Sequence, residues 1–195
     1  SGAMGLLYWN WYSIHNGYEA YWMWLLGHDL EENPAYREAC RIGEDWRNIG
    51  KRLAGLTKEN KAAIVVDNQS LDALKWYPVD KDLSYNDIVR WVYDSLYELN
   101  IECDVVDVNA LVPERYQMIA APALYSVSKE TADALDRFVK EGGVLIGTFR
   151  SFAADRNLSI YPDQKPHGLT GCFGMMYQQF TEPGRMRVKG KQVRY

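Results

Sequence analysis

From residue 61 onward, short apolar runs of strand length alternate with amphipathic segments of helix length. The apolar runs lie at 62–67, 102–108, 118–124 and 144–149. Ser84 and Ser128 each stand in an N-cap position before an apolar stripe at helical spacing. Near-continuous apolar strands joined through helices are typical of parallel strands that are buried on both faces. This alternation predicts an α/β domain with a doubly wound, flavodoxin-like parallel sheet.

The N-terminal segment has a different character, because eight of its aromatic rings fall between positions 8 and 24. Residues 5–12 predict a strand, 13–17 predict a turn, and 18–26 predict the start of a helix. Asn33 and Pro34 then predict the N-cap and first turn of a long amphipathic helix.

We expect that helix to end near Gly55 or Asn60 and to act as a bridge. The expected parts are residues 1–33, the bridging helix 34–60 and the α/β domain 61–195. The alternating basic and apolar tail after Pro183 predicts one more strand. Because Met4 follows Ser1-Gly2-Ala3 and the tail stops abruptly, we expect a fragment that is cut at both ends.

Composition excludes several classes of partner and location. The 22 basic and 26 acidic residues give a net charge of −4, so no basic field predicts nucleic acid or an anionic membrane as a partner. No apolar run approaches the roughly 20 residues that cross a bilayer. Three widely spaced cysteines and no visible secretory signal predict a reducing, cytoplasmic location.

The aromatic segment suggests a sugar-binding surface, because the C–H face of a sugar packs on indole and phenol rings. Trp9 and Trp11 would lie on one side of the predicted strand, and Glu19 and Trp22 on one face of the predicted helix. Glu19 is the only acid between residues 1 and 28. The alternative is that these rings are ordinary core packing.

His15 and His28, with Asp29 beside the latter, are candidate catalytic residues or metal ligands. A zinc site needs three or four convergent ligands, and the sequence shows no such spacing. We therefore expect hydrogen-bonded structural roles for both histidines, with no metal and no cofactor.

The α/β domain resembles the fold of the class I glutamine amidotransferases, whose nucleophile lies on a Gly-x-Cys-x-Gly turn between a strand and a helix. None of Cys40, Cys103 and Cys172 lies on such a turn, and the expected loops at 68–70 and 125–126 contain no cysteine. The glycine-rich turn of a dinucleotide site is also missing after the first strand. We interpret the domain as a scaffold without catalytic residues.

Residues 8–38, from YWNWYSIHNGYEAYW to NPAYRE, resemble the end of the catalytic (β/α)8 barrel of a glycoside hydrolase family 42 β-galactosidase. The stretches AAIVVDNQS, YNDIVRWVYDSLYELNIECDVV, YQMIAAPALYSVS and FVKEGGVLIGTF resemble that family's amidotransferase-like trimerisation domain. The resemblance covers nearly the whole chain.

The resemblance implies a retaining enzyme that releases terminal β-linked galactose from small saccharides and assembles as a homotrimer. Its two catalytic glutamates would precede this chain, so the chain alone is expected to be inactive. Glu19 would accept hydrogen bonds from galactose hydroxyls, and Trp9 and Trp22 would line the pocket. The alternative class is a non-catalytic carbohydrate-binding or oligomerisation module. A free amidotransferase is disfavoured, because the cysteine turn is missing.

Overall fold

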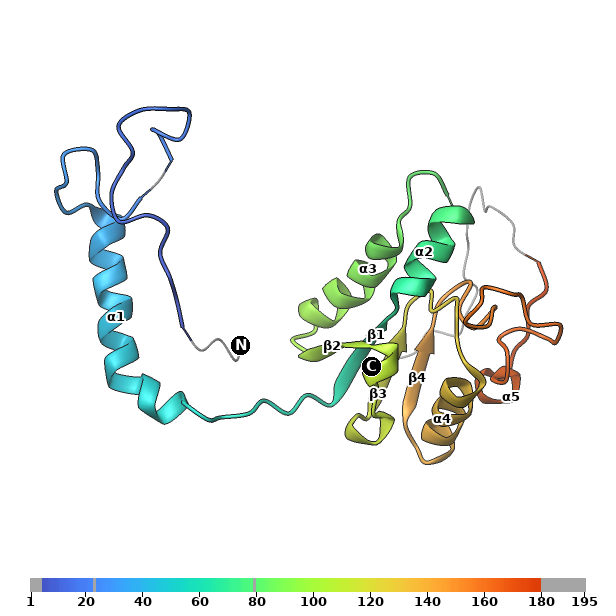
Figure 1. Cartoon of the computed structure of the whole chain (residues 1–195). Coiled ribbons are helices and arrows are strands. Elements are labelled where there is room, and N and C mark those ends of the chain that lie inside the picture. Colours follow the sequence, from blue (N-terminus) through green and yellow to red (C-terminus); the bar gives the residue numbers. More distant parts are fainter. Residues whose placement is uncertain (1–4, 23, 79, 180–195) are drawn as a thin grey trace. The chain divides into compact units, whose positions relative to one another are not determined.

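The computed structural model describes residues 5–22, 24–78 and 80–179. The chain divides into two compact units, Ser1–Glu59 and Asn60–Tyr195 (Figure 1). The strand predicted after Pro183 lies outside the described residues. Within the described ranges, no helix has the length and apolar character that a bilayer crossing requires.

The second unit is built on a four-stranded sheet in which every pair of neighbouring strands is parallel. The strands are β1 (Ala62–Val66), β2 (Cys103–Asp107), β3 (Met118–Ala121) and β4 (Val144–Gly147). Their spatial order is β2-β1-β3-β4, so Ile64 of β1 stands between Val105 of β2 and Ala120 of β3. The predicted parallel sheet is confirmed.

Helices and 3-10 turns connect these strands, and one short helix follows the last strand. The helices are α2 (Asn68–Trp76), α3 (Tyr85–Glu98), α4 (Lys129–Lys140) and the short α5 (Thr170–Phe173), with 3-10 turns at Val108–Ala110 and Pro113–Arg115. Both predicted N-caps are confirmed: the Ser84 hydroxyl accepts the Asp87 N–H at 3.2 Å, and the Ser128 hydroxyl accepts the Thr131 N–H at 3.2 Å. These caps satisfy donors that the first helical turn leaves unpaired.

The predicted loop at 68–70 is wrong, because α2 begins there. The buried Asp67 carboxylate accepts the Ser70 N–H at 2.7 Å and so caps the helix. No loop separates α2 from β1. The start of α2 is therefore hard to recognise in the sequence, because it directly follows the apolar run of the strand.

Alternate residues of the two central strands face opposite helix layers, as the two-residue period of a strand requires. The core on the α4 side contains Ala63, Val65, Ile119, Ala121, Leu135 and Phe138. The core on the α3 side contains Ile64, Ala120 and Leu96. Helices α3 and α4 therefore cover opposite faces of the sheet (Figure 1).

The first unit contains one long helix, α1 (Pro34–Leu53). The predicted N-cap is confirmed, since the Asn33 side chain accepts the Tyr36 N–H at 2.9 Å. The helix ends close to the first of its two predicted ends, and Gly55 follows with φ of 82°. Glycine adopts this left-handed conformation without a steric penalty and commonly follows a helix.

Before α1 the first unit has loops and turns instead of the predicted strand and helix. Residues 5–12 form a single β-bridge, between Tyr12 and Leu26. A strand needs a neighbouring strand with which to form a ladder of hydrogen bonds, and the described residues provide none for this segment. Residues 18–22 form a turn in which the Trp22 N–H donates to the Glu19 carbonyl at 3.1 Å. This bond spans three residues, so no α-helical turn forms there.

Candidate functional site

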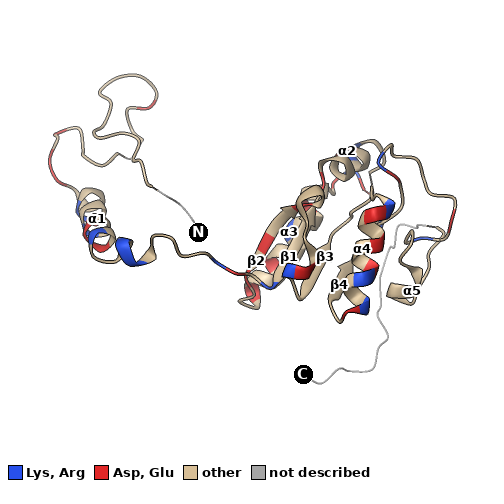
Figure 2. Cartoon of the chain, turned by 60° about the horizontal axis from the view of Figure 1, so that its bottom comes forward, with Lys and Arg blue, Asp and Glu red and all other residues tan. Residues whose placement is uncertain are grey.

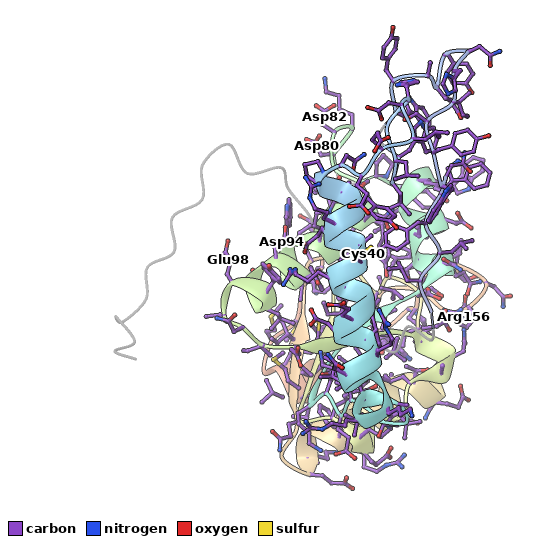
Figure 3. The ribbon with its side chains drawn as sticks, turned by 90° about the vertical axis from the view of Figure 1, so that its left-hand side faces the viewer. Cys40, Asp80, Asp82, Asp94, Glu98 and Arg156 are labelled. Carbon is purple, nitrogen blue, oxygen red and sulfur yellow. The ribbon has the colours of Figure 1, made fainter. Side chains whose placement is uncertain are left out.

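The predicted sugar-contacting residues lie on the loops of the first unit. Trp9 and Trp22 are 74% and 56% exposed, and Glu19 is half-buried. The turn at 18–22 places Glu19 and Trp22 together, while the Trp9 segment meets the later loop through the Leu25 N–H, which donates to the Asn10 carbonyl at 3.5 Å. Figure 3 shows a group of ring side chains on the loops before α1.

Aromatic contacts extend around Trp22. Its ring lies 6.3 Å from that of Tyr18, edge to face, and 6.5 Å from that of Trp24. Trp24 is buried, and its indole Nε1 has no hydrogen-bond acceptor among the described residues. A buried donor without an acceptor costs about 1–3 kcal/mol. The sequence analysis did not single out Trp24 as a site residue. It relied on the spacing of residues along strands and helices, with periods of about 2 and 3.6, and neither spacing applies to loops.

The two histidines of this unit contact each other. Their ring centroids are 5.4 Å apart in an edge-to-face arrangement, and His28 Nε2 lies 3.2 Å from the Ile14 carbonyl oxygen, to which the ring N–H donates. The Asp29 carboxylate accepts the Glu31 N–H at 3.1 Å. In the parts of the chain that the structure describes, no three potential metal ligands converge.

The second unit has a polar cluster at the carboxyl end of β1. The Asp67 carboxylate is 1% exposed and accepts hydrogen bonds from Ser70 Oγ at 2.6 Å and from Arg156 Nη1 at 3.0 Å. The Ser126 N–H, beyond β3, donates to Ser70 Oγ at 2.9 Å. Tyr85 closes the cluster: its hydroxyl accepts the Asp67 N–H at 3.0 Å, and burial raises the pKa of Tyr85 to about 12.

This cluster occupies the position where open α/β sheets usually bind ligands. The strand order changes direction between β1 and β3, and ligands bind outside the carboxyl ends of the strands at such a point. The N-terminus of α2 would be an anion site, but the Asp67 carboxylate already accepts the Ser70 N–H there. Paired side chains of the chain itself therefore fill the usual ligand position.

An α/β hydrolase carries its nucleophile on a sharp turn between a strand and a helix, and the turn after β3 leads towards helix α4. Here the residue is Ala123, which is fully buried and has φ of 45°. Its N–H donates to Thr148 Oγ1 at 2.7 Å. A methyl group in this left-handed conformation provides no nucleophile.

The three cysteines lie elsewhere, on α1, β2 and α5. Burial raises the pKa of the Cys172 thiol, which lowers its thiolate fraction and its reactivity. Cys40 is exposed on α1 (Figure 3).

A cavity of about 770 Å³ lies beside the turn that follows β3. Its walls include the rings of Tyr77, Tyr125 and Tyr177 and the guanidinium of Arg150. The Tyr177 hydroxyl donates to the Ser151 carbonyl at 2.8 Å, and burial raises its pKa to about 12. The phenol therefore remains neutral and fixed at ordinary pH.

Known proteins resemble this chain over both units. A family model described as the beta-galactosidase trimerisation domain matches residues 60–192. Beta-galactosidase BgaH of Haloferax lucentense is 30% identical over 173 residues, which cover 89% of this chain and 25% of that protein.

Two solved structures show the same architecture. The β-galactosidase from Bacillus circulans sp. alkalophilus superposes with a TM-score of 0.80 at 25% identity, covering 91% of this chain and 27% of that one. Gan42B, a GH42 β-galactosidase from G. stearothermophilus, gives a TM-score of 0.79 at 25% identity and covers 93% and 27%. The chain spans about a quarter of the length of the relatives that it matches.

Proposed function

The chain belongs to the β-galactosidase trimerisation domain family of glycoside hydrolase family 42, and we propose that it is part of a retaining β-galactosidase that acts on small saccharides. One observation carries this proposal. The match to β-galactosidases extends over more than nine-tenths of the chain and so includes the ring-rich loops as well as the α/β unit.

In this proposal the segment before α1 belongs to the end of a (β/α)8 barrel, and its loops form one wall of the sugar pocket. Substrates bind at the carboxyl face of such barrels. The exposed rings of Trp9 and Trp22 supply apolar faces for a sugar, and the Glu19 carboxylate accepts hydrogen bonds from its hydroxyls. The buried Nε1 of Trp24 has no acceptor among the described residues, although a buried donor normally finds one. This supports the proposal that other parts of the protein complete the pocket wall.

The second unit has an assembly role in this proposal and holds copies of the protein together as a homotrimer. Two features of its site support a role without chemistry. The ligand position at the end of β1 is filled by the Asp67–Arg156 ion pair, and the turn that could carry a nucleophile has Ala123 instead.

Retaining hydrolysis needs two carboxyl groups about 5 Å apart, one as nucleophile and one as acid/base. The resemblance assigns these groups to a part of the enzyme outside these 195 residues. We therefore expect the isolated chain not to hydrolyse a nitrophenyl β-galactoside, whereas the complete protein that contains it should do so.

The role of Glu19 is tested in that complete protein. Glu19→Ala should lower kcat/KM by about 100-fold or more, since a hydrogen-bonding carboxylate would be lost from the pocket. The melting temperature should stay within about 2 °C of the wild type. Glu31→Ala is the matched control, because it removes an exposed carboxylate from the same unit.

Three outcomes would contradict the proposal. Turnover by the isolated chain would mean that it holds its own catalytic carboxylates. A Glu19→Ala variant with normal kcat/KM would remove Glu19 from the pocket. A complete protein without β-galactosidase activity would favour a non-catalytic carbohydrate-binding or oligomerisation module.

A further inference from the structure

Charged side chains along α4 already pair with one another. Lys129 pairs with Asp133 at 2.7 Å, and Lys140 pairs with Asp136 at 2.6 Å. Figure 2 shows basic and acidic side chains together along this helix. Paired, exposed charges of this kind are typical of a solvated face. The cavity of about 770 Å³ in the same unit has a different lining, in which rings and hydrogen-bonding groups alternate with apolar side chains.

The cavity lies where strands of the sheet end. Tyr125 follows β3 and Arg150 follows β4, and both line the cavity. Open α/β sheets bind ligands outside the carboxyl ends of their strands, and small-molecule sites commonly have volumes of about 300–1,000 Å³. The ion pair of Asp67 and Arg156 fills the position at the end of β1. The cavity therefore offers the space for a ligand that the end of β1 lacks.

Two of the three rings in the wall are held in place. The Tyr177 hydroxyl donates to the Ser151 carbonyl at 2.8 Å. Tyr125 is buried, and its carbonyl accepts the Ala153 N–H at 3.0 Å. Tyr77 is the third ring and is 60% exposed. A ligand would thus meet two rings that are already ordered, which lowers the entropic cost of binding.

The backbone of the cavity wall is strained at two positions. Arg150 and Leu158 have φ of 60° and 63°, a left-handed conformation that residues with a side chain rarely adopt. The Arg150 guanidinium donates to the Tyr77 carbonyl, and the Leu158 N–H donates to the Asp155 carbonyl at 3.0 Å. Such conformations persist only where the surrounding structure holds them, and they cluster at ligand sites. The strain therefore supports a binding role for this wall.

The polar groups of the wall suit a neutral ligand that carries several hydroxyls. The Lys165 ammonium donates to the Tyr161 carbonyl at 2.5 Å and to the Asp163 carbonyl, so this cation holds the loop that forms the wall. The guanidinium of Arg150 also bonds to the wall itself. Carboxylate oxygens of Asp163 can accept hydrogen bonds, and the amide of Gln164 can both donate and accept them. A hydroxyl group needs both kinds of partner.

We propose that this cavity binds a neutral saccharide. The rings of Tyr77, Tyr125 and Tyr177 pack against its apolar C–H faces, and Asp163 and Gln164 bond to its hydroxyls. The choice of a saccharide rests also on the proposed function, in which the protein acts on small saccharides and meets them in solution. The inference adds a saccharide site within the α/β unit, to which the proposed function gives only an assembly role.

The test uses the complete protein and lactose as the probe. A 2-deoxy-2-fluorogalactoside first blocks the catalytic pocket by leaving a covalent sugar on the nucleophile, which also prevents hydrolysis of the probe. Saturation-transfer NMR then measures the binding of lactose. Amide hydrogen exchange of peptides from residues 148–165 locates the bound sugar. We expect lactose to bind the blocked protein and to slow exchange in these peptides.

Two variants examine the wall. Tyr77→Ala should weaken lactose binding by about 10-fold, since one packed ring is lost. Gln164→Ala should weaken it by about 5-fold, the effect of one neutral hydrogen bond. Both side chains are exposed, so neither change removes a core contact. The matched control is Tyr97→Ala, which removes a 71% exposed phenol of α3 that lies outside the cavity lining. Thermal melts verify that all variants are folded.

Weaker lactose binding by both variants, with an unchanged control, supports the inference. An active wild type that does not bind lactose after blocking overturns the inference and leaves the proposed function intact. Binding that neither Tyr77→Ala nor Gln164→Ala weakens overturns it too, because the sugar then lies elsewhere. Displacement of lactose by inorganic phosphate would overturn the neutral saccharide and assign the cavity to an anion. A protein without β-galactosidase activity contradicts the proposed function, and titration of the unblocked protein then decides the cavity by its dependence on Tyr77.

Discussion

Removing the Asp67 carboxylate should destabilise the second unit more than any other single loss of a polar group at the sheet edge. This side chain is 1% exposed and supports three partners: the start of α2, the Ser70 hydroxyl and the Arg156 guanidinium. Loss of an N-cap costs about 1 kcal/mol. Loss of a hydrogen bond to a charged group costs about 1.5–3 kcal/mol.

The ion pair adds less, because the Arg156 side chain is 34% exposed and water screens its charge. We assign it about 1 kcal/mol. The sum predicts that Asp67→Ala lowers the free energy of unfolding by about 3.5–5 kcal/mol, which lies within the usual cost of breaking a buried pair. Asp67→Asn should cost less, since its amide oxygen still caps α2.

Urea unfolding, followed through hydrogen exchange of the β1 amides, reports on the second unit separately from the first. The control is Asp72→Ala, which breaks an exposed pair with Lys75 on the same helix and should cost less than about 0.5 kcal/mol. A double-mutant cycle with Arg156→Ala isolates the coupling between the two charges. An Asp67→Ala loss below about 1 kcal/mol would refute this reasoning.

Two further predictions concern stability. Burial raises the pKa of Tyr85 from 10.0 to about 12, so its neutral form is favoured in the fold, and the free energy of unfolding should fall by up to about 2 kcal/mol between pH 10 and 12. Tyr85→Phe should lose this part of the alkaline dependence in urea titrations; an unchanged profile would contradict the assignment. Gly143→Ala places a methyl group against the Phe138 ring and should cost about 1–3 kcal/mol, whereas Gly171→Ala has open space and should be nearly neutral. Equal melting temperatures for these two alanine variants would argue against the close packing.

Local sequence determined much of the second unit. The apolar runs predicted four parallel strands, because a strand buried on both faces has no polar alternation. Ser84 and Ser128 predicted the starts of α3 and α4, since an N-cap bond spans only three residues. The same reasoning missed α2, because its N-cap, Asp67, also forms the polar end of the apolar run at 62–67.

Other features depended on residues that are distant in the chain. Arg156 reaches Asp67 across 89 positions, and no local pattern marks that pair. Ala123 has an ordinary sequence context, yet packing between β3 and the later loops holds it at positive φ. In the first unit, the strand predicted at 5–12 did not form, because strand structure requires neighbouring strands as well as apolar residues. Composition and spacing therefore determined which segments could be buried, and only the tertiary structure decided which charges met, which turn was strained and which rings remained exposed.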